Sequence, residues 1–293
     1  MFGRSIELVK ASYSVLRQDK ELLVFPFIST LGLIVVTILF MIPLAATGVF
    51  EAASTTTTAA DGTVETALSS AQTITLFVFV FLFYLVTYTV IIFSNTALIG
   101  AALMRLRGED PTVADGFRIA RERLPTIIGY AAISATVGMI LQAIRGDEDN
   151  IVGQIVAAII GTAWNLITFL VIPVLVIENV GPIQAIKRSG TLLKSTWGEN
   201  VVASFGMGII QLLAMLAVGV VVGLPMYLIA SAIGSGFVTA IAIGIVGIVL
   251  GAVMLFFAAL NGIFQAALYN YATEGEAGEF FPAGMVEGAF QHK

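Results

Sequence analysis

The chain has 293 residues, of which 58% are hydrophobic and only 11% are charged. Soluble domains average about 25% charged residues, so this composition excludes an ordinary soluble globular protein. The formal net charge is −5, and there is no cysteine, which excludes disulfides, thiol nucleophiles and cysteine-ligated metals.

Long runs without Asp, Glu, Lys or Arg follow one another along the chain. A helix needs roughly 20 apolar residues to cross about 30 Å of hydrocarbon. The runs are continuous rather than alternating, which favours helices over a β-barrel. The last run is long enough for two crossings, with a break at 230–236 (ASAIGSG), so we predict an all-α membrane protein with six transmembrane helices. The runs are Leu22–Phe50, Ala67–Met104, Leu124–Ile144, Asn150–Ile177 and Val201–Thr273.

Positive charge alternates between the loops. Residues 51–72 contain no Lys or Arg, and residues 145–149 contain one Arg beside three acids. The positive-inside rule therefore predicts a multi-pass protein of the cell membrane with both termini in the cytoplasm. The basic segments are Arg4, Lys10, Arg17 and Lys20; then Arg105, Arg107, Arg118, Arg121 and Arg123; and then Lys187, Arg188 and Lys194.

The three basic segments resemble one another. The first and third match at an offset of 177, which pairs Lys10 with Lys187, Ser12 with Ser189 and Arg17 with Lys194. Each segment has an apolar stripe at helical spacing and a basic opposite face, the pattern of a helix lying in the membrane interface. Short cytoplasmic helices packed on their own loops are the alternative. The predicted helices are Ile6–Leu16, Val113–Leu124 and Ile183–Leu193.

A threefold repeat follows from this pattern. Each amphipathic helix precedes a hairpin of two spans, so the three hairpins are parallel within a single membrane domain, 1–293. The repeats cover about 1–104, 105–178 and 179–275, followed by a cytoplasmic tail, 276–293. An asparagine in each even-numbered span supports the alignment: Asn95, Asn165 and Asn261.

One stretch between the fourth and fifth spans carries a family resemblance. Residues 178–199 read ENVGPIQAIKRSGTLLKSTWGE, and the opening Arg4–Pro26 and closing 268–272 (LYNYA) are similar too. They resemble a broad group of uncharacterised prokaryotic six-span proteins that includes the membrane domain of some glycerophosphodiester phosphodiesterases. The resemblance implies a six-helix membrane domain. The soluble phosphodiesterase domain is absent, so its activity is not implied.

The sequence offers little for catalysis. The one histidine, His292, lies next to the C-terminus, and no nucleophile elbow or Walker loop is present. We therefore predict no enzyme activity, no cofactor and no metal.

The candidate binding residues are basic. Lys10, Arg17, Arg118, Arg121, Lys187, Arg188 and Lys194 are the predicted contacts to lipid headgroups. Glu178 and Pro182 are the predicted elbow between the fourth span and the next amphipathic helix, with Glu178 in a salt bridge to Lys187 or Arg188. A coupling site at Glu178 is the alternative.

Polar and small residues inside the spans suggest helix contacts. Asn95, Asn165 and Asn261 are expected to lie at similar depth and to turn away from lipid, because an unsatisfied amide is costly there. They either bond to neighbouring helices or line a polar cavity. The Gly219-xxx-Gly223 and Gly247-xxx-Gly251 pairs are expected to pack helices together within the chain.

Two functions remain open. The leading prediction is a non-enzymatic module that acts as a membrane scaffold, handles lipid or binds a partner, with its basic helices on the cytoplasmic leaflet. Its partners are membrane lipids, with another membrane protein or a second copy as alternatives; nucleic acid is excluded. The second prediction is a transporter or channel for a small solute or lipid, whose polar cavity is lined by Asn95, Asn165 and Asn261. A shared cavity would favour transport, and a packed centre would favour the scaffold.

Overall fold

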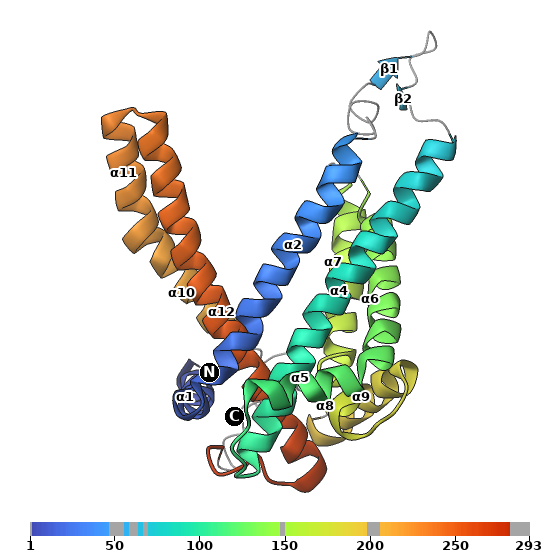
Figure 1. The fold of residues 1–293 in the computed structure, drawn as a ribbon, viewed down its shortest axis with the longest axis vertical. Helices are drawn as coiled ribbons and strands as arrows, with labels where there is room; N and C mark the ends of the chain where they lie inside the picture. Colours follow the sequence, from blue (N-terminus) through green and yellow to red (C-terminus); the bar gives the residue numbers. More distant parts are fainter. Residues whose placement is uncertain are drawn as a thin grey trace.

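A computed structural model describes residues 2–46, 56–58, 64–66, 70–146, 150–197 and 206–281. Within these residues the protein is all-α, apart from two three-residue strands, and six helical segments are long and apolar enough to cross a membrane. The predicted six-span, multi-pass architecture is therefore confirmed (Figure 1). The spans are α2 (Val24–Ala46), α4 (Ser70–Leu106), α6 (Leu124–Arg145), α7 (Ile151–Ile167) with α8 (Val171–Ile177), α10 (Gly206–Val218) with η3 (Gly219–Gly223) and α11 (Leu224–Ile233), and α12 (Gly236–Glu274).

A further helix precedes each odd-numbered span. These are α1 (Phe2–Gln18), α5 (Val113–Glu122) and α9 (Pro182–Trp197), and the short 3₁₀ helix η1 (Lys20–Leu23) joins α1 to α2. All three predicted segments are helical. Helix α5 ends two residues earlier than predicted, because Leu124 begins α6 and Pro125 suits the first turn of a new helix. Strands β1 (Thr56–Thr58) and β2 (Val64–Thr66) pair antiparallel between α2 and α4.

The core lies where the even-numbered spans converge at their C-terminal ends. Helix α4 packs on both α8 and α12. Small residues allow this close approach: a Cβ on Gly262 of α12 would lie 2.4 Å from Leu98 Cδ2 of α4. The fully buried residues of this core include Ala97, Ala101 and Ala102 of α4, Leu170, Val171 and Val174 of α8, and Leu260, Ile263 and Ala267 of α12.

Helices α1, α5 and α9 each pack on one of the even-numbered spans that form this core. Helix α5 packs on α4, the span before it, and α9 packs on α8, the span before it. Helix α1 packs on the last span, α12. Figure 1 shows all three at the same end of the bundle, close to the end of α12.

The fourth span is broken, which was not predicted. Helix α7 ends at Ile167 and α8 begins at Val171. Pro173 lacks an N–H and its ring clashes with the carbonyl four residues earlier, that of Phe169, so the helix cannot run through unchanged. The break therefore follows from one proline.

The last hairpin diverges from the rest of the bundle. Figure 1 shows α10, α11 and the first half of α12 running away from α2 as a two-helix arm. The most apolar 18-residue window of Gly208–Ile233 has no residue buried inside the structure. The expectation that Gly219, Gly223, Gly247 and Gly251 pack helices together within the chain was wrong, because a Cβ on any of them would meet nothing within 4 Å. Their small size is not used for close packing in this arm.

Candidate functional site at the basic end of the bundle

Helices α1 and α9 pack against the bundle with residues at matching positions of the two helices. Val15 and Leu16 of α1 are buried, and so are their counterparts 177 residues later, Leu192 and Leu193. The equivalent serines, Ser12 and Ser189, are both fully buried. The two helices therefore have the same rotational setting against the core.

The opposite sides of α1 and α9 present exposed cations. Lys10 and Arg17 of α1 are exposed, as are Lys187 and Lys194 at the equivalent positions of α9. Across the described ranges, none of the four forms an ion pair. No carboxylate of the described residues neutralises these four charges.

Arg118 of α5 is engaged within its own helix. Its guanidinium lies 2.9 Å from Asp115 Oδ1 and 3.7 Å from Glu122 Oε1. Hydrogen bonds from Thr112 and Arg118 lower the pKa of Asp115 to about 2. Thr112 and Asp115 form a reciprocal cap on α5, in which the Asp115 N–H donates to Thr112 Oγ1 and the Thr112 N–H donates to Asp115. Arg121 is exposed and has no ion pair within the described part of the chain.

Glu178 joins the fourth span to α9 and to the last span. The Arg188 Nε–H donates to both carboxylate oxygens of Glu178, at 2.9 and 3.1 Å, and the buried Tyr269 hydroxyl of α12 donates to Oε1 at 3.2 Å. Pro182 begins α9 and lies against Gly129 of α6. Arg188 therefore belongs to this elbow rather than to the set of unpaired cations.

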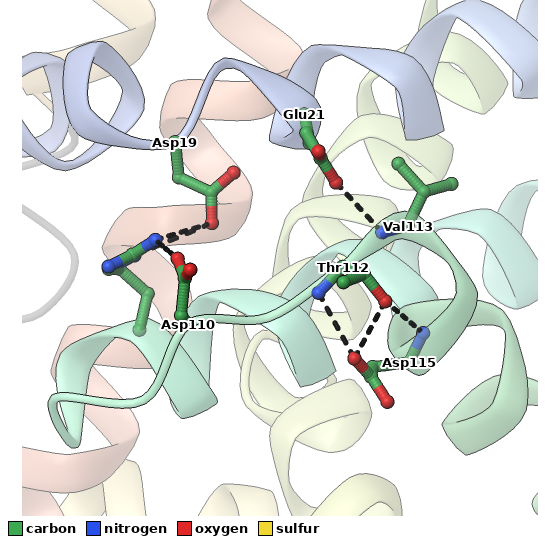
Figure 2. Close-up of polar contacts among 7 residues, drawn as sticks. Asp19, Glu21, Asp110, Thr112, Val113 and Asp115 are labelled. Atoms are coloured by element: carbon green, nitrogen blue, oxygen red, sulfur yellow. Dashed lines mark hydrogen bonds and ion pairs between the residues drawn. The ribbon is translucent and has the colours of Figure 1, made fainter.

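A second polar cluster holds the α1–α2 elbow to the loop after α4 (Figure 2). Arg105 Nη2 lies 3.4 Å from Asp19 Oδ2 and also pairs with Asp110. The carboxylate of Glu21 accepts the Val113 N–H at 3.0 Å, at the start of α5. Burial raises the pKa of Asp19, although Arg105 opposes the shift. This cluster fixes the α1–α2 elbow to the end of α4 and the start of α5.

Two more contacts tie the ends of the spans together. Arg107 Nη2 lies 3.0 Å from Glu274 Oε1, which joins α4 to α12. Arg123, between α5 and α6, donates to the Val176 carbonyl at 3.2 Å and to Asn179, whose φ of 50° is in the left-handed region. These carboxylates and carbonyls hold several cations of this end in internal contacts.

The three asparagines are not placed alike. Asn95 and Asn261 are half-buried in α4 and α12, next to the Leu98–Gly262 contact, whereas Asn165 is exposed on α7. Within the described ranges, no three His, Asp or Glu side chains come together as a metal site requires.

Sequence reasoning missed Asp19 and Tyr269 as members of these clusters. Asp19 looked like one more polar residue ahead of a span, and Tyr269 lies in an apolar run. Their partners, Arg105 and Glu178, are 86 and 91 residues away. A signal in the sequence exists only for Asp19, which follows directly after an amphipathic helix.

Comparison with known proteins finds one family. Residues 74–281 match a family of unknown function (DUF6159), from within α4 to just beyond α12, which is well over half of the chain. No curated protein matches the chain. These comparisons give no support to the resemblance to the glycerophosphodiester phosphodiesterase membrane domain.

Proposed function

The chain belongs to the family of unknown function DUF6159, and we propose that it is a non-enzymatic membrane module whose basic helices bind anionic headgroups of the cytoplasmic leaflet. One observation carries the proposal. Lys10, Arg17, Lys187 and Lys194 are exposed at matched positions of α1 and α9, opposite the sides that the two helices bury.

The cations at this end of the bundle differ in whether they are free to bind lipid headgroups. Each Lys or Arg near an anionic surface adds about 1 kcal/mol of attraction. Arg118 and Arg188 already contact carboxylates of the chain, so they contribute less. The proposed headgroup contacts are therefore Lys10, Arg17, Arg121, Lys187 and Lys194.

The position of the helices supports the same function. Helices α1, α5 and α9 lie together at one end of the bundle, where the even-numbered spans converge (Figure 1). A helix whose one side is buried against spans and whose other side is basic suits the headgroup region. We propose that these helices lie in the cytoplasmic interface and organise anionic lipid around the module.

The transporter alternative depends on a cavity shared by the three asparagines. Asn165 is exposed on α7, whereas Asn95 and Asn261 are half-buried near the α4–α12 contact. This arrangement favours the lipid-binding module over a shared polar lining.

Native mass spectrometry tests the proposal. The protein is reconstituted in nanodiscs of mixed phosphatidylglycerol and phosphatidylethanolamine, and the lipids that stay bound after release are counted. We expect a preference for phosphatidylglycerol that falls on the order of fivefold for each charge removed in K10Q, R17Q, K187Q and K194Q, and that weakens with added salt.

R118Q is the matched control, because it removes the same charge from a helix of the same kind. Arg118 is held by Asp115 and Glu122, so its loss should change lipid retention little. Equal effects of R118Q and K187Q, or a quadruple variant that keeps its phosphatidylglycerol, would contradict the proposal.

A further inference from the structure

Two equivalent serines have different surroundings. Ser189 of α9 is fully buried, and its Oγ accepts the Leu170 N–H at 2.9 Å. Ser12 of α1 is also fully buried, yet its Oγ has no hydrogen-bond partner. Buried polar atoms are nearly always paired, so the unpaired hydroxyl of Ser12 calls for an explanation.

The partner of Ser189 exists because the fourth span is broken. In a continuous helix the Leu170 N–H would donate to the Leu166 carbonyl. At the break, the Phe169 N–H takes that carbonyl at 3.2 Å, which frees the Leu170 N–H for Ser189. Pro173, three residues further on, prevents the regular helix from re-forming.

The pair formed by α1 and the last span corresponds to the pair formed by α9 and the fourth span. Helix α1 packs on α12, and α9 packs on α8. Aligning Asn261 with Asn165, an offset of 96, places Ala266 at the position of Leu170 and Tyr269 at that of Pro173. Because α12 has no proline there, it runs unbroken from Gly236 to Glu274, and Ser12 is left without a free N–H to accept.

We propose that α12 has a second conformation, bent near Ala266, in which the Ala266 N–H donates to Ser12 Oγ. In this bent form the Gln265 N–H donates to the Gly262 carbonyl, as the Phe169 N–H does to Leu166. Both backbone N–H groups stay paired in the exchange and the buried hydroxyl of Ser12 gains its partner, while the Asn261 carbonyl gives up the Gln265 N–H. The bend turns the two-helix arm relative to α2.

Two features of α12 suit such a bend. Gly262 lies one turn before Ala266, and glycine weakens a helix interior where kinks form. Between Gly236 and Phe256, the one buried residue of α12 is Ala242, so few contacts hold the outer part of the arm. The buried residues Phe257, Leu260 and Ile263 lie within about 14 Å of the bend, at 1.5 Å per residue, and are therefore displaced less than the outer arm.

The arm amplifies a small bend. The 26 residues from Ala240 to Ala266 span about 39 Å at 1.5 Å per residue. A kink of about 20° at Ala266 would move Ala240 by about 13 Å. A displacement of this size is easily resolved by distances between spin labels.

Double electron–electron resonance on the full chain in nanodiscs tests the bend. The chain contains no cysteine, so spin labels at L39C in α2 and A240C in α12 report the arm alone. We expect two distance populations that differ by roughly 10 Å. S12A should reduce the bent population roughly two- to tenfold, because it removes the hydrogen bond that stabilises it.

S189A is the matched control, since it removes the equivalent hydroxyl from α9 and should leave the ratio of the two populations unchanged. A single distance in the unsubstituted chain would overturn the proposal. Two populations that S12A does not shift would overturn it as well, and would mean that Ser12 has no part in the motion.

Discussion

Ser189 replaces a backbone acceptor inside the fourth span. Its hydroxyl is fully buried and holds the Leu170 N–H that the broken helix cannot satisfy. S189A would leave that N–H buried and unpaired. We expect a loss of about 1–3 kcal/mol in unfolding free energy, which denaturant titration of the detergent-solubilised protein measures.

A second substitution, P173A, tests whether the loss of stability in S189A comes from the missing hydrogen bond. P173A allows the span to re-form a continuous helix, so the Leu170 N–H can return to the Leu166 carbonyl. The effect of S189A should then be smaller in P173A than in the unsubstituted chain. Equal losses in both backgrounds would show that the hydroxyl acts through packing rather than through this hydrogen bond.

Which cations are ion-paired within the described residues was only partly predictable from residue types. The 177-residue offset correctly related Lys10 to Lys187 and Arg17 to Lys194, and all four are exposed. Arg118 and Arg188 had the same basic pattern but contact Asp115 and Glu178. Such pairing depends on helix ends and on side-chain direction, which the spacing of charges does not contain.

At the scale of elements, α5 begins with a capping box that depends on an ionised carboxylate. Hydrogen bonds from Thr112 and Arg118 hold the pKa of Asp115 at about 2, below its ordinary value of 3.8. Because the pKa is lower in the folded chain, the carboxylate stabilises the fold above about pH 4. This contribution is lost as the pH falls from about 4 to about 2.

D115N isolates this dependence. The variant should melt at a lower temperature than the unsubstituted protein at pH 6, and the gap between the two should close as the pH falls toward 2. Thermal melts followed by tryptophan fluorescence at a series of pH values provide the comparison. E122Q, which alters the longer contact to Arg118, serves as control. A gap independent of pH would contradict the role of the cap.

Helices were predictable where one residue property dominates. Charge-free length identified the six spans, and apolar spacing identified α1, α5 and α9. The break after Ile167 was missed, because Pro173 lies in a run that is apolar throughout. Glycine spacing was misleading in Gly219-xxx-Gly223, since small residues permit close packing without supplying a neighbour.

On the scale of the whole molecule, the threefold repeat stays a prediction, and the last hairpin departs from the regularity that it implies. The predicted three units are consistent with the packing of α5 on α4, α9 on α8 and α1 on α12. The departure of α10, α11 and the first half of α12 from α2 breaks that regularity (Figure 1). Sequence periodicity reports which side of a helix is apolar, but an apolar face in a membrane packs on lipid as readily as on another helix.

Binding to the cytoplasmic leaflet requires the basic end of the bundle to face the cytoplasm. The chain has no cysteine, so a single cysteine introduced as T57C in β1 or as K187C in α9 can be labelled selectively. Each reports which side of the membrane its position faces. In intact bacterial cells, a membrane-impermeant thiol reagent should label T57C, and it should reach K187C only after the membrane is permeabilised. Labelling of K187C but not T57C in intact cells would reverse the orientation and contradict binding to the cytoplasmic leaflet.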